Sequence, residues 1–128
     1  MDLAPFLIGV VDDDPRVLES LEELLASGGY QTVLFPSAEA FIDANGLQRV
    51  DCLISDIGMP NQDGYDLIRK VRARSTDRAS QIPAIALTAF ARSQDRLKAL
   101  SAGYQMHVAK PIEPLELVTV VASLTHRL

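Results

Sequence analysis

Five short apolar runs, separated by longer amphipathic stretches, constrain the fold of this chain more than any other feature. The runs cover residues 6–11, 32–35, 52–55, 84–87 and 106–108. Each is short and apolar or β-branched, without strict alternation of polar and apolar residues. Such runs are typical of strands buried on both faces of a parallel sheet. The last run gives the weakest signal of the five.

The stretches between the runs have the spacing of amphipathic helices. The first helix is expected to begin after Asp14, a favourable N-cap, with Pro15 at its first position, and to end at Gly28 and Gly29. The other four are expected to begin near Ser37, Gly64, Ser93 and Pro114. Strands that alternate with helices predict an α/β fold, in which a doubly wound parallel sheet of five strands carries helices on both faces.

Composition narrows the class of protein. The 128 residues, 48% of them apolar, are expected to form a single domain over residues 1–128. A net charge of −5 without a basic run gives no reason to expect nucleic-acid binding. The single cysteine, Cys52, excludes an internal disulfide, and no segment approaches the roughly 20 apolar residues of a membrane span. Without the positive start of a signal peptide, the chain is expected to be cytoplasmic.

Polar side chains follow four of the apolar runs. Asp12 and Asp13 follow the first run, Asp56 the third, Thr88 the fourth and Lys110 the fifth. The carboxyl ends of parallel strands lie at one edge of the sheet, and ligands bind there at the switch in strand order. We therefore expect these five side chains to lie close together.

A group of carboxylates at one edge needs nearby cations, because like charges otherwise raise one another's pKa. Lys110 is one such cation, and Mg²⁺ is the expected other, since it prefers oxygen ligands and keeps positions open for water or phosphate oxygens. An aspartate can attack phosphorus and form an aspartyl-phosphate, while a lysine and the Thr88 hydroxyl stabilise the phosphoryl oxygens. The residues therefore predict Mg²⁺-dependent phosphoryl transfer to an aspartate.

Other kinds of site fit these strand ends less well. They carry no Ser–His or Cys–His pair, and the chain has no GxxxxGK[ST] motif of a P-loop nucleoside triphosphatase. A flavin-binding protein of flavodoxin architecture needs a hydroxyl- and glycine-rich loop after the first strand to hold phosphate. The loop here reads Asp12, Asp13, Asp14, Pro15, which repels phosphate.

Four motifs, in order along the chain, resemble the receiver domain of bacterial two-component response regulators. They are residues 6–15 with the acidic pair, residues 53–60 with the Asp-Gly at 63–64, residues 86–89 and residues 108–111. The resemblance spans essentially the whole chain and implies a flavodoxin-like (βα)5 sheet with strand order 2-1-3-4-5. Residues 84–114 look most similar to receivers of hybrid sensor histidine kinases.

The resemblance implies a role for each site residue. Asp56 accepts the phosphoryl group. Asp13, Asp56 and the backbone carbonyl of Gly58 bind Mg²⁺ directly, and Asp12 acts through a bound water. Lys110 pairs first with the acceptor carboxylate and then with the phosphoryl group. Such a domain is not a conventional enzyme, but it catalyses its own phosphorylation and, more slowly, its own dephosphorylation.

The resemblance also implies a conformational switch. Thr88 moves to bond a phosphoryl oxygen, and the Lys110–Pro111 peptide bond is cis. Many family members carry Tyr or Phe where this chain has His107, and that aromatic ring turns inward on activation. The His107 imidazole could turn in the same way, or His107 could be a partly exposed residue with no switching role. The sequence favours neither interpretation. Gly58 offers no side chain over the phosphoryl group. This glycine could open the site to water or to the donor, but the favoured interpretation is that it simply suits a turn.

The implied partners are a histidine kinase or histidine phosphotransfer domain as donor, and a downstream output protein or domain. The surface of the fourth helix, fifth strand and fifth helix is expected to report phosphorylation. Apolar residues on more than one face of the fifth helix favour a partner or homodimer surface there.

The alternative function is a phosphorylation-independent interaction module, which usually lacks the acceptor or an acidic-pair residue. The sequence names no kinase, stimulus or output and leaves a standalone protein or a hybrid-kinase fragment open.

Overall fold

A parallel sheet of five strands forms the centre of the structure, a computed structural model that describes residues 6–44, 49–73, 81–89 and 93–125. The strands are β1 (Leu7–Val11), β2 (Gln31–Phe35), β3 (Cys52–Asp56), β4 (Ala84–Thr88) and β5 (Met106–Ala109). Their order across the sheet is β2-β1-β3-β4-β5, and every neighbouring pair is parallel. The predicted α/β fold and strand order are confirmed.

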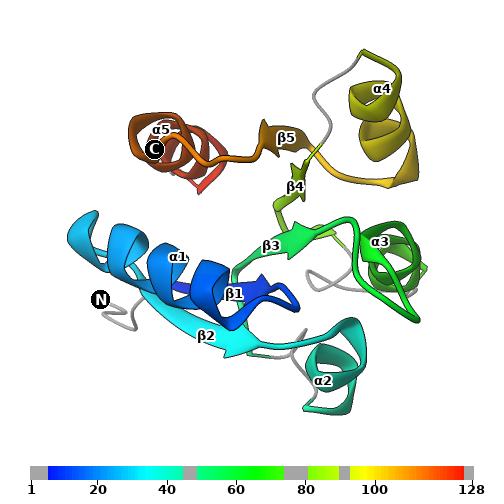
Figure 1. Ribbon diagram of the computed structural model, residues 1–128, viewed down its shortest axis with the longest axis horizontal. Helices are drawn as coiled ribbons and strands as arrows, with labels where there is room; N and C mark the ends of the chain where they lie inside the picture. The colour runs from blue at the N-terminus through cyan, green and yellow to red at the C-terminus, as the bar shows by residue number, and fades with distance from the viewer. Residues whose placement is uncertain (1–5, 45–48, 74–80, 90–92, 126–128) are drawn as a thin grey trace.

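Five helices cover the two faces of this sheet. They are α1 (Pro15–Ser27), α2 (Ala38–Asp43), α3 (Gly64–Arg72), α4 (Ser93–Ala102) and α5 (Pro114–Thr125). In Figure 1, α1 and α5 lie on one side of the strands, and α2, α3 and α4 lie on the other. Each strand is followed by one helix, and all neighbouring strands are parallel. The carboxyl ends of all five strands, four of which carry the predicted polar residues, therefore point the same way.

Two apolar clusters, one on each face, hold the layers together. The side under α1 and α5 includes Leu21, Leu25, Ile54, Val108 and Leu117, all fully buried. The opposite side contains residues of β3, α2, α3 and α4, among them Leu53, Phe41, Leu67, Ile68 and Ala99. Successive residues of a strand face opposite sides, which is why β3 can supply apolar side chains to both clusters while placing an aspartate at its end.

Local capping residues set where the helices begin. The Asp14 side chain accepts a hydrogen bond from the backbone N–H of Arg16, and Pro15 occupies the first helical position, as predicted. At α3 the Asp63 and Asp66 side chains accept from each other's backbone N–H groups, which forms a capping box. This second cap places Gly64 at the first position of α3, next to the end of β3.

Two expectations about the strands need correction. Strands β2 and β5 are not buried on both faces, because they lie at the sheet edges. Residues 32–34 of β2 are only half-buried, and only Val108 of β5 is buried. Strands β3 and β4 each extend one residue further than the apolar run predicted. Asp56 pairs with Leu87 and Thr88 pairs with Ala109, since backbone pairing does not require an apolar side chain.

The ends of the predicted single domain, residues 1–5 and 126–128, lie outside the described residues. Within the described part of the chain, no helix combines the length and the apolar character needed to cross a membrane.

Candidate functional site

Three carboxylates meet where β1 and β3 end. Asp12 and Asp13 follow β1, Asp56 closes β3, and one oxygen from each lies within 4.8 Å of the others. Asp12 is fully buried and Asp56 is 6% exposed, whereas Asp13 is exposed to solvent. Strands β1 and β3 are hydrogen-bonded neighbours, and β2 lies on the far side of β1. The cluster therefore lies at the switch in strand order, as predicted.

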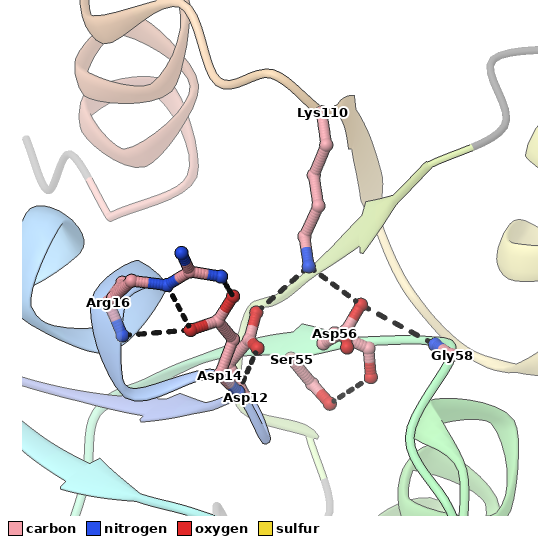
Figure 2. A network of polar contacts seen from close by, with 7 residues as sticks. All are labelled: Asp12, Asp14, Arg16, Ser55, Asp56, Gly58 and Lys110. Atoms are coloured by element: carbon pink, nitrogen blue, oxygen red, sulfur yellow. Dashed lines mark hydrogen bonds and ion pairs between the residues drawn. The ribbon is translucent and has the colours of Figure 1, made fainter.

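Lys110 reaches this cluster from the end of β5 (Figure 2). Its ammonium nitrogen lies 3.0 Å from Asp12 Oδ2 and 3.1 Å from Asp56 Oδ1. Burial alone lowers the pKa of Lys110, but its hydrogen bond to Asp12 and the charges of the two carboxylates outweigh that effect and raise the pKa. Lys110 therefore stays a cation throughout the physiological range. The Lys110–Pro111 peptide bond is cis, as predicted.

Asp12 is the most enclosed carboxylate of the site. Its Oδ1 accepts a hydrogen bond from the backbone N–H of Asp14 at 2.9 Å, and its Oδ2 accepts one from Lys110. Burial raises the pKa of Asp12, and the charge of Asp56 adds to the rise; the two hydrogen bonds oppose it without cancelling it. The site thus holds a carboxylate whose charge is incompletely compensated by the protein.

The Asp56 carboxylate presents its two oxygens differently. Its Oδ1 accepts from Lys110 and, at 3.4 Å, from the backbone N–H of Gly58. In Figure 2 the other oxygen, Oδ2, has no partner among the residues drawn, and no described residue donates to it. The buried Ser55 hydroxyl donates to the Asp56 backbone carbonyl at 3.0 Å, which fixes the strand end behind the carboxylate. One oxygen is therefore held in place while the other is open.

The loop after Asp56 packs tightly at one point and loosely at another. A Cβ added to Gly64 would lie 2.5 Å from the Asp56 carbonyl oxygen and 2.8 Å from the Cα of Ile57, so only glycine fits there. A Cβ added to Gly58 would meet nothing within 4 Å. The start of α3 therefore rests directly on the end of β3, while the space beside Gly58 is open.

A pocket of about 410 Å³ opens over Asp56. Three predicted site residues, Asp56, Thr88 and Lys110, line it together with Gly58. Its wall also includes three polar or aromatic side chains that were not predicted as site residues: Tyr65 of α3, and Asp95 and Lys98 of α4. The Lys98 ammonium lies 4.4 Å from the centre of the Tyr65 ring, a cation–π distance.

His107 lies apart from the carboxylates. It is half-buried on β5 and lines a second pocket of about 400 Å³, which also includes Arg96 and Leu100 of α4 and Glu116 of α5. Its Nε2 atom is buried and has no hydrogen-bond partner within the described part of the chain. The structure thus brings Asp12, Asp13, Asp56 and Lys110 together and leaves His107 on the α4–β5–α5 face, where its predicted switching role stays a prediction.

The donor set fits a hard divalent cation. Three carboxylate oxygens at mutual distances below 4.8 Å suit Mg²⁺, which binds few carboxylates and keeps several waters. One ammonium, that of Lys110, faces three carboxylates at this site, and a divalent ion would supply the missing positive charge. The carbonyl of Gly58 lies in the adjoining loop and stays a predicted ligand.

The family model for the response regulator receiver domain matches residues 8–122 of this chain. A 14.6 kDa protein of Leptolyngbya boryana is 39% identical over 93% of this chain and 89% of its own length. The transcriptional regulatory protein FixJ of Bradyrhizobium diazoefficiens is 32% identical over 91% of this chain, and the alignment covers 55% of FixJ. The chain therefore spans about half the length of that longer relative.

Solved structures agree with this match. The receiver domain of a sensor histidine kinase from Pseudomonas aeruginosa, solved with a magnesium ion in its active site cleft, has a TM-score of 0.82 and 32% identity, covering 94% of this chain and 98% of its own. The low-resolution structure of the response regulator StyR has a TM-score of 0.81 and 30% identity, covering 94% of this chain and 59% of StyR. From its sequence motifs, its fold and its acidic cluster, the chain belongs to the response regulator receiver domain family.

Proposed function

We propose that this domain is a phosphorylation-dependent signalling switch, in which Asp56 accepts a phosphoryl group from a phosphohistidine of a histidine kinase or phosphotransfer protein. The observation that carries the proposal is the Asp56 carboxylate itself. One of its oxygens is held by Lys110 and the Gly58 N–H, and no described residue donates to the other. Asp56 also lines a pocket and lies beside two further carboxylates. A fixed carboxylate with one open oxygen is the geometry that a nucleophile needs.

Asp12, Asp13 and Asp56 would hold Mg²⁺ together with the Gly58 carbonyl, Asp12 acting through a water. The bound ion supplies a Lewis acid that neutralises charge on the phosphoryl oxygens. Asp13 is the exposed member of the cluster, so the ion is expected to enter from the solvent side. Burial of the charged Asp12 carboxylate opposes folding, which is typical of a group placed to bind a ligand rather than to stabilise the fold.

The transfer step uses the side chains in fixed positions. Asp56 Oδ2 attacks phosphorus, a new O–P bond forms, the N–P bond of the donor breaks, and the imidazole leaves with the bonding electron pair and takes up a proton. Lys110, already 3.1 Å from the acceptor carboxylate, then pairs with a phosphoryl oxygen, and the Thr88 hydroxyl is expected to bond another. In the slower dephosphorylation, a water oxygen forms a new bond to phosphorus and the O–P bond to Asp56 breaks. The bonding electron pair returns to the Asp56 carboxylate, and inorganic phosphate leaves with the protons of the water, which it shares with the solvent.

Phosphorylation is expected to change the surface formed by α4, β5 and α5. Thr88 closes β4 and is 5% exposed, so its movement toward the phosphoryl group shifts a buried group next to that surface. The exposed apolar side chains Leu97 of α4 and Leu115 of α5, 63% and 73% exposed, support a partner or homodimer contact there.

The output partner is a downstream protein or domain. Residues 1–128 act as one receiver domain, in a standalone regulator or within a longer protein.

Labelling by a small phosphodonor tests this function. The wild-type chain is incubated with acetyl phosphate with and without Mg²⁺, beside Asp56→Asn and the control Asp43→Asn, which removes an exposed carboxylate from α2. We expect label only with Mg²⁺, in the wild type and in Asp43→Asn. Equal label in Asp56→Asn, or none in the wild type, contradicts the proposal; the second result favours a phosphorylation-independent interaction module.

A further inference from the structure

The turn between α4 and β5 reaches the phosphoryl-acceptor loop through a buried tyrosine. Tyr104 is 3% exposed, and its hydroxyl donates a hydrogen bond to the Gly64 carbonyl at 2.7 Å. Gly64 in turn donates from its N–H to the Ile57 carbonyl at 3.0 Å. A continuous path of hydrogen bonds therefore joins Tyr104 to the residue that directly follows Asp56.

The contact at Gly64 leaves no room for adjustment. The α3 backbone there lies so close to the Asp56 carbonyl that an added Cβ would be 2.5 Å from it. Any displacement of Gly64 is therefore passed directly to the end of β3, because close-packed groups transmit small shifts. Tyr104 holds the Gly64 carbonyl by its hydroxyl. Burial raises the pKa of this phenol, so Tyr104 remains a neutral donor.

The same turn also holds the other end of α3. The Arg72 guanidinium, at the last residue of the helix, donates to the Gly103 carbonyl at 3.0 Å and to Gln105 Oε1 at 2.9 Å. Gln105 Oε1 also accepts from the Ala84 N–H at the start of β4. Three consecutive residues, 103–105, thus fix α3 at both ends and leave its position little freedom.

We infer that Tyr104 is a positioning residue that holds the acceptor loop, residues 57–63, at the distance from the acidic cluster that metal binding and phosphoryl transfer need. The part of this inference that concerns the rate of phosphorylation rests on the proposed function, whereas the part that concerns Mg²⁺ affinity does not. Loss of the hydroxyl frees Gly64 and lets the loop carrying Gly58 move away from Asp56. Mg²⁺ then binds more weakly, and transfer at saturating Mg²⁺ slows because Asp56 is less well oriented.

The test compares Tyr104→Phe and Tyr104→Met with Leu25→Val. Both Tyr104 variants remove the hydroxyl but keep an apolar side chain, and Leu25→Val loosens the core on the α1 side, far from the acceptor loop. Mg²⁺ affinity is measured by NMR titration, and the rate of labelling by acetyl phosphate is measured at saturating Mg²⁺. We expect both Tyr104 variants to raise the Mg²⁺ Kd and to lower the labelling rate, each by roughly fivefold, while Leu25→Val changes neither by more than about twofold.

The outcomes separate this inference from the proposed function. If the Tyr104 variants bind Mg²⁺ with wild-type affinity, the inference is overturned. It is also overturned if Leu25→Val loses as much Mg²⁺ affinity and labelling rate as they do, because the effect then follows from lost stability alone. If the wild type takes no label, the proposed function fails, and the Mg²⁺ titration still decides the role of Tyr104. If the wild type is labelled at Asp56 and the Tyr104 variants match it in both readouts, the proposed function stands and only this inference is lost.

Discussion

The Lys110 ammonium lies 3.1 Å from the Asp56 carboxylate, and this ion pair joins the ends of two strands that are not neighbours in the sheet. The same ammonium contacts Asp12 at 3.0 Å, so one cation is shared between two carboxylates. Lys110 therefore neutralises part of the negative charge that a metal ion would otherwise neutralise. Its ammonium also lies where it could pair with an oxygen of a phosphoryl group on Asp56.

Replacing Lys110 by glutamine is expected to move two properties in opposite directions. Mg²⁺ binding becomes tighter, by roughly 1–2 kcal/mol, because a repelling cation has gone. Labelling by acetyl phosphate becomes at least about tenfold slower, because the phosphoryl oxygens lose a cation. A calorimetric Mg²⁺ titration and a labelling time course measure the two effects. Weaker Mg²⁺ binding in Lys110→Gln would show that the lysine organises the metal ligands rather than competing with the ion.

Asp13→Asn is expected to stabilise the metal-free protein. The exposed Asp13 carboxylate lies within 4.8 Å of two others, so its removal relieves repulsion and raises Tm by about 2–4 °C. Added Mg²⁺ should raise the Tm of the wild type and leave that of Asp13→Asn almost unchanged, since the variant lacks one of the proposed direct ligands. Thermal unfolding with chelator and with Mg²⁺ measures both. Asp43→Asn is the charge-matched control, and a Tm rise of the same size there attributes the effect to net charge.

The stability of the metal-free protein is expected to depend on pH through Asp12. Burial raises the pKa of Asp12 above its ordinary 3.8, so the folded chain binds this proton more tightly than the unfolded chain does. At pH values above the Asp12 pKa of both the folded and the unfolded chain, the charged carboxylate therefore lowers the free energy of unfolding. This destabilisation disappears as the pH falls through the raised pKa of the folded chain. Asp12→Asn should exceed the wild type in unfolding free energy near neutral pH.

That advantage of Asp12→Asn should shrink steadily as the pH falls toward the ordinary aspartate value. Urea unfolding of both proteins in chelator, over a series of pH values, gives the difference at each point. A difference that widens on acidification contradicts the assignment, because it would mean that the Asp12 pKa is lowered in the folded chain.

Gly58 in the acceptor loop and Gly64 at the start of α3 should differ in their response to alanine. Gly64→Ala is expected to lose about 1–3 kcal/mol of unfolding free energy, because its Cβ would lie 2.5 Å from the Asp56 carbonyl oxygen. Gly58→Ala should stay within about 0.5 kcal/mol of the wild type, since its Cβ meets nothing within 4 Å. Urea denaturation measures both changes. Equal losses at the two positions would mean that the α3 N-terminus does not rest on β3 as described.

The acidic cluster was predictable because parallel strands carry their carboxyl ends to one edge. Asp12, Asp56 and Lys110 each stand at or just beyond the end of an apolar run, and that position alone brings them together. The N-cap role of Asp14 was likewise local and predictable. Contacts of this kind follow from the order of the elements and not from the details of side-chain packing.

The role of Tyr104 could not be predicted in the same way. Its hydroxyl reaches Gly64 across the fold, and the contact depends on the shape of the turn after α4 and on how closely α3 approaches β3. The contact of Lys98 with Tyr65 depends likewise on how α4 lies beside α3. The one local signal that sequence reasoning missed is the pair Asp63 and Asp66, whose spacing is that of a capping box at the start of α3.

The position of the phosphoryl group on the labelled chain tests the central claim most directly. After reaction with acetyl phosphate and Mg²⁺, the acyl phosphate is reduced with borohydride and the chain is mapped by tandem mass spectrometry. We predict that the single modified residue is Asp56, with none at Asp12 or Asp13. Modification at either of those residues, or on a serine, threonine or histidine, contradicts the assignment of Asp56 as the phosphoryl acceptor.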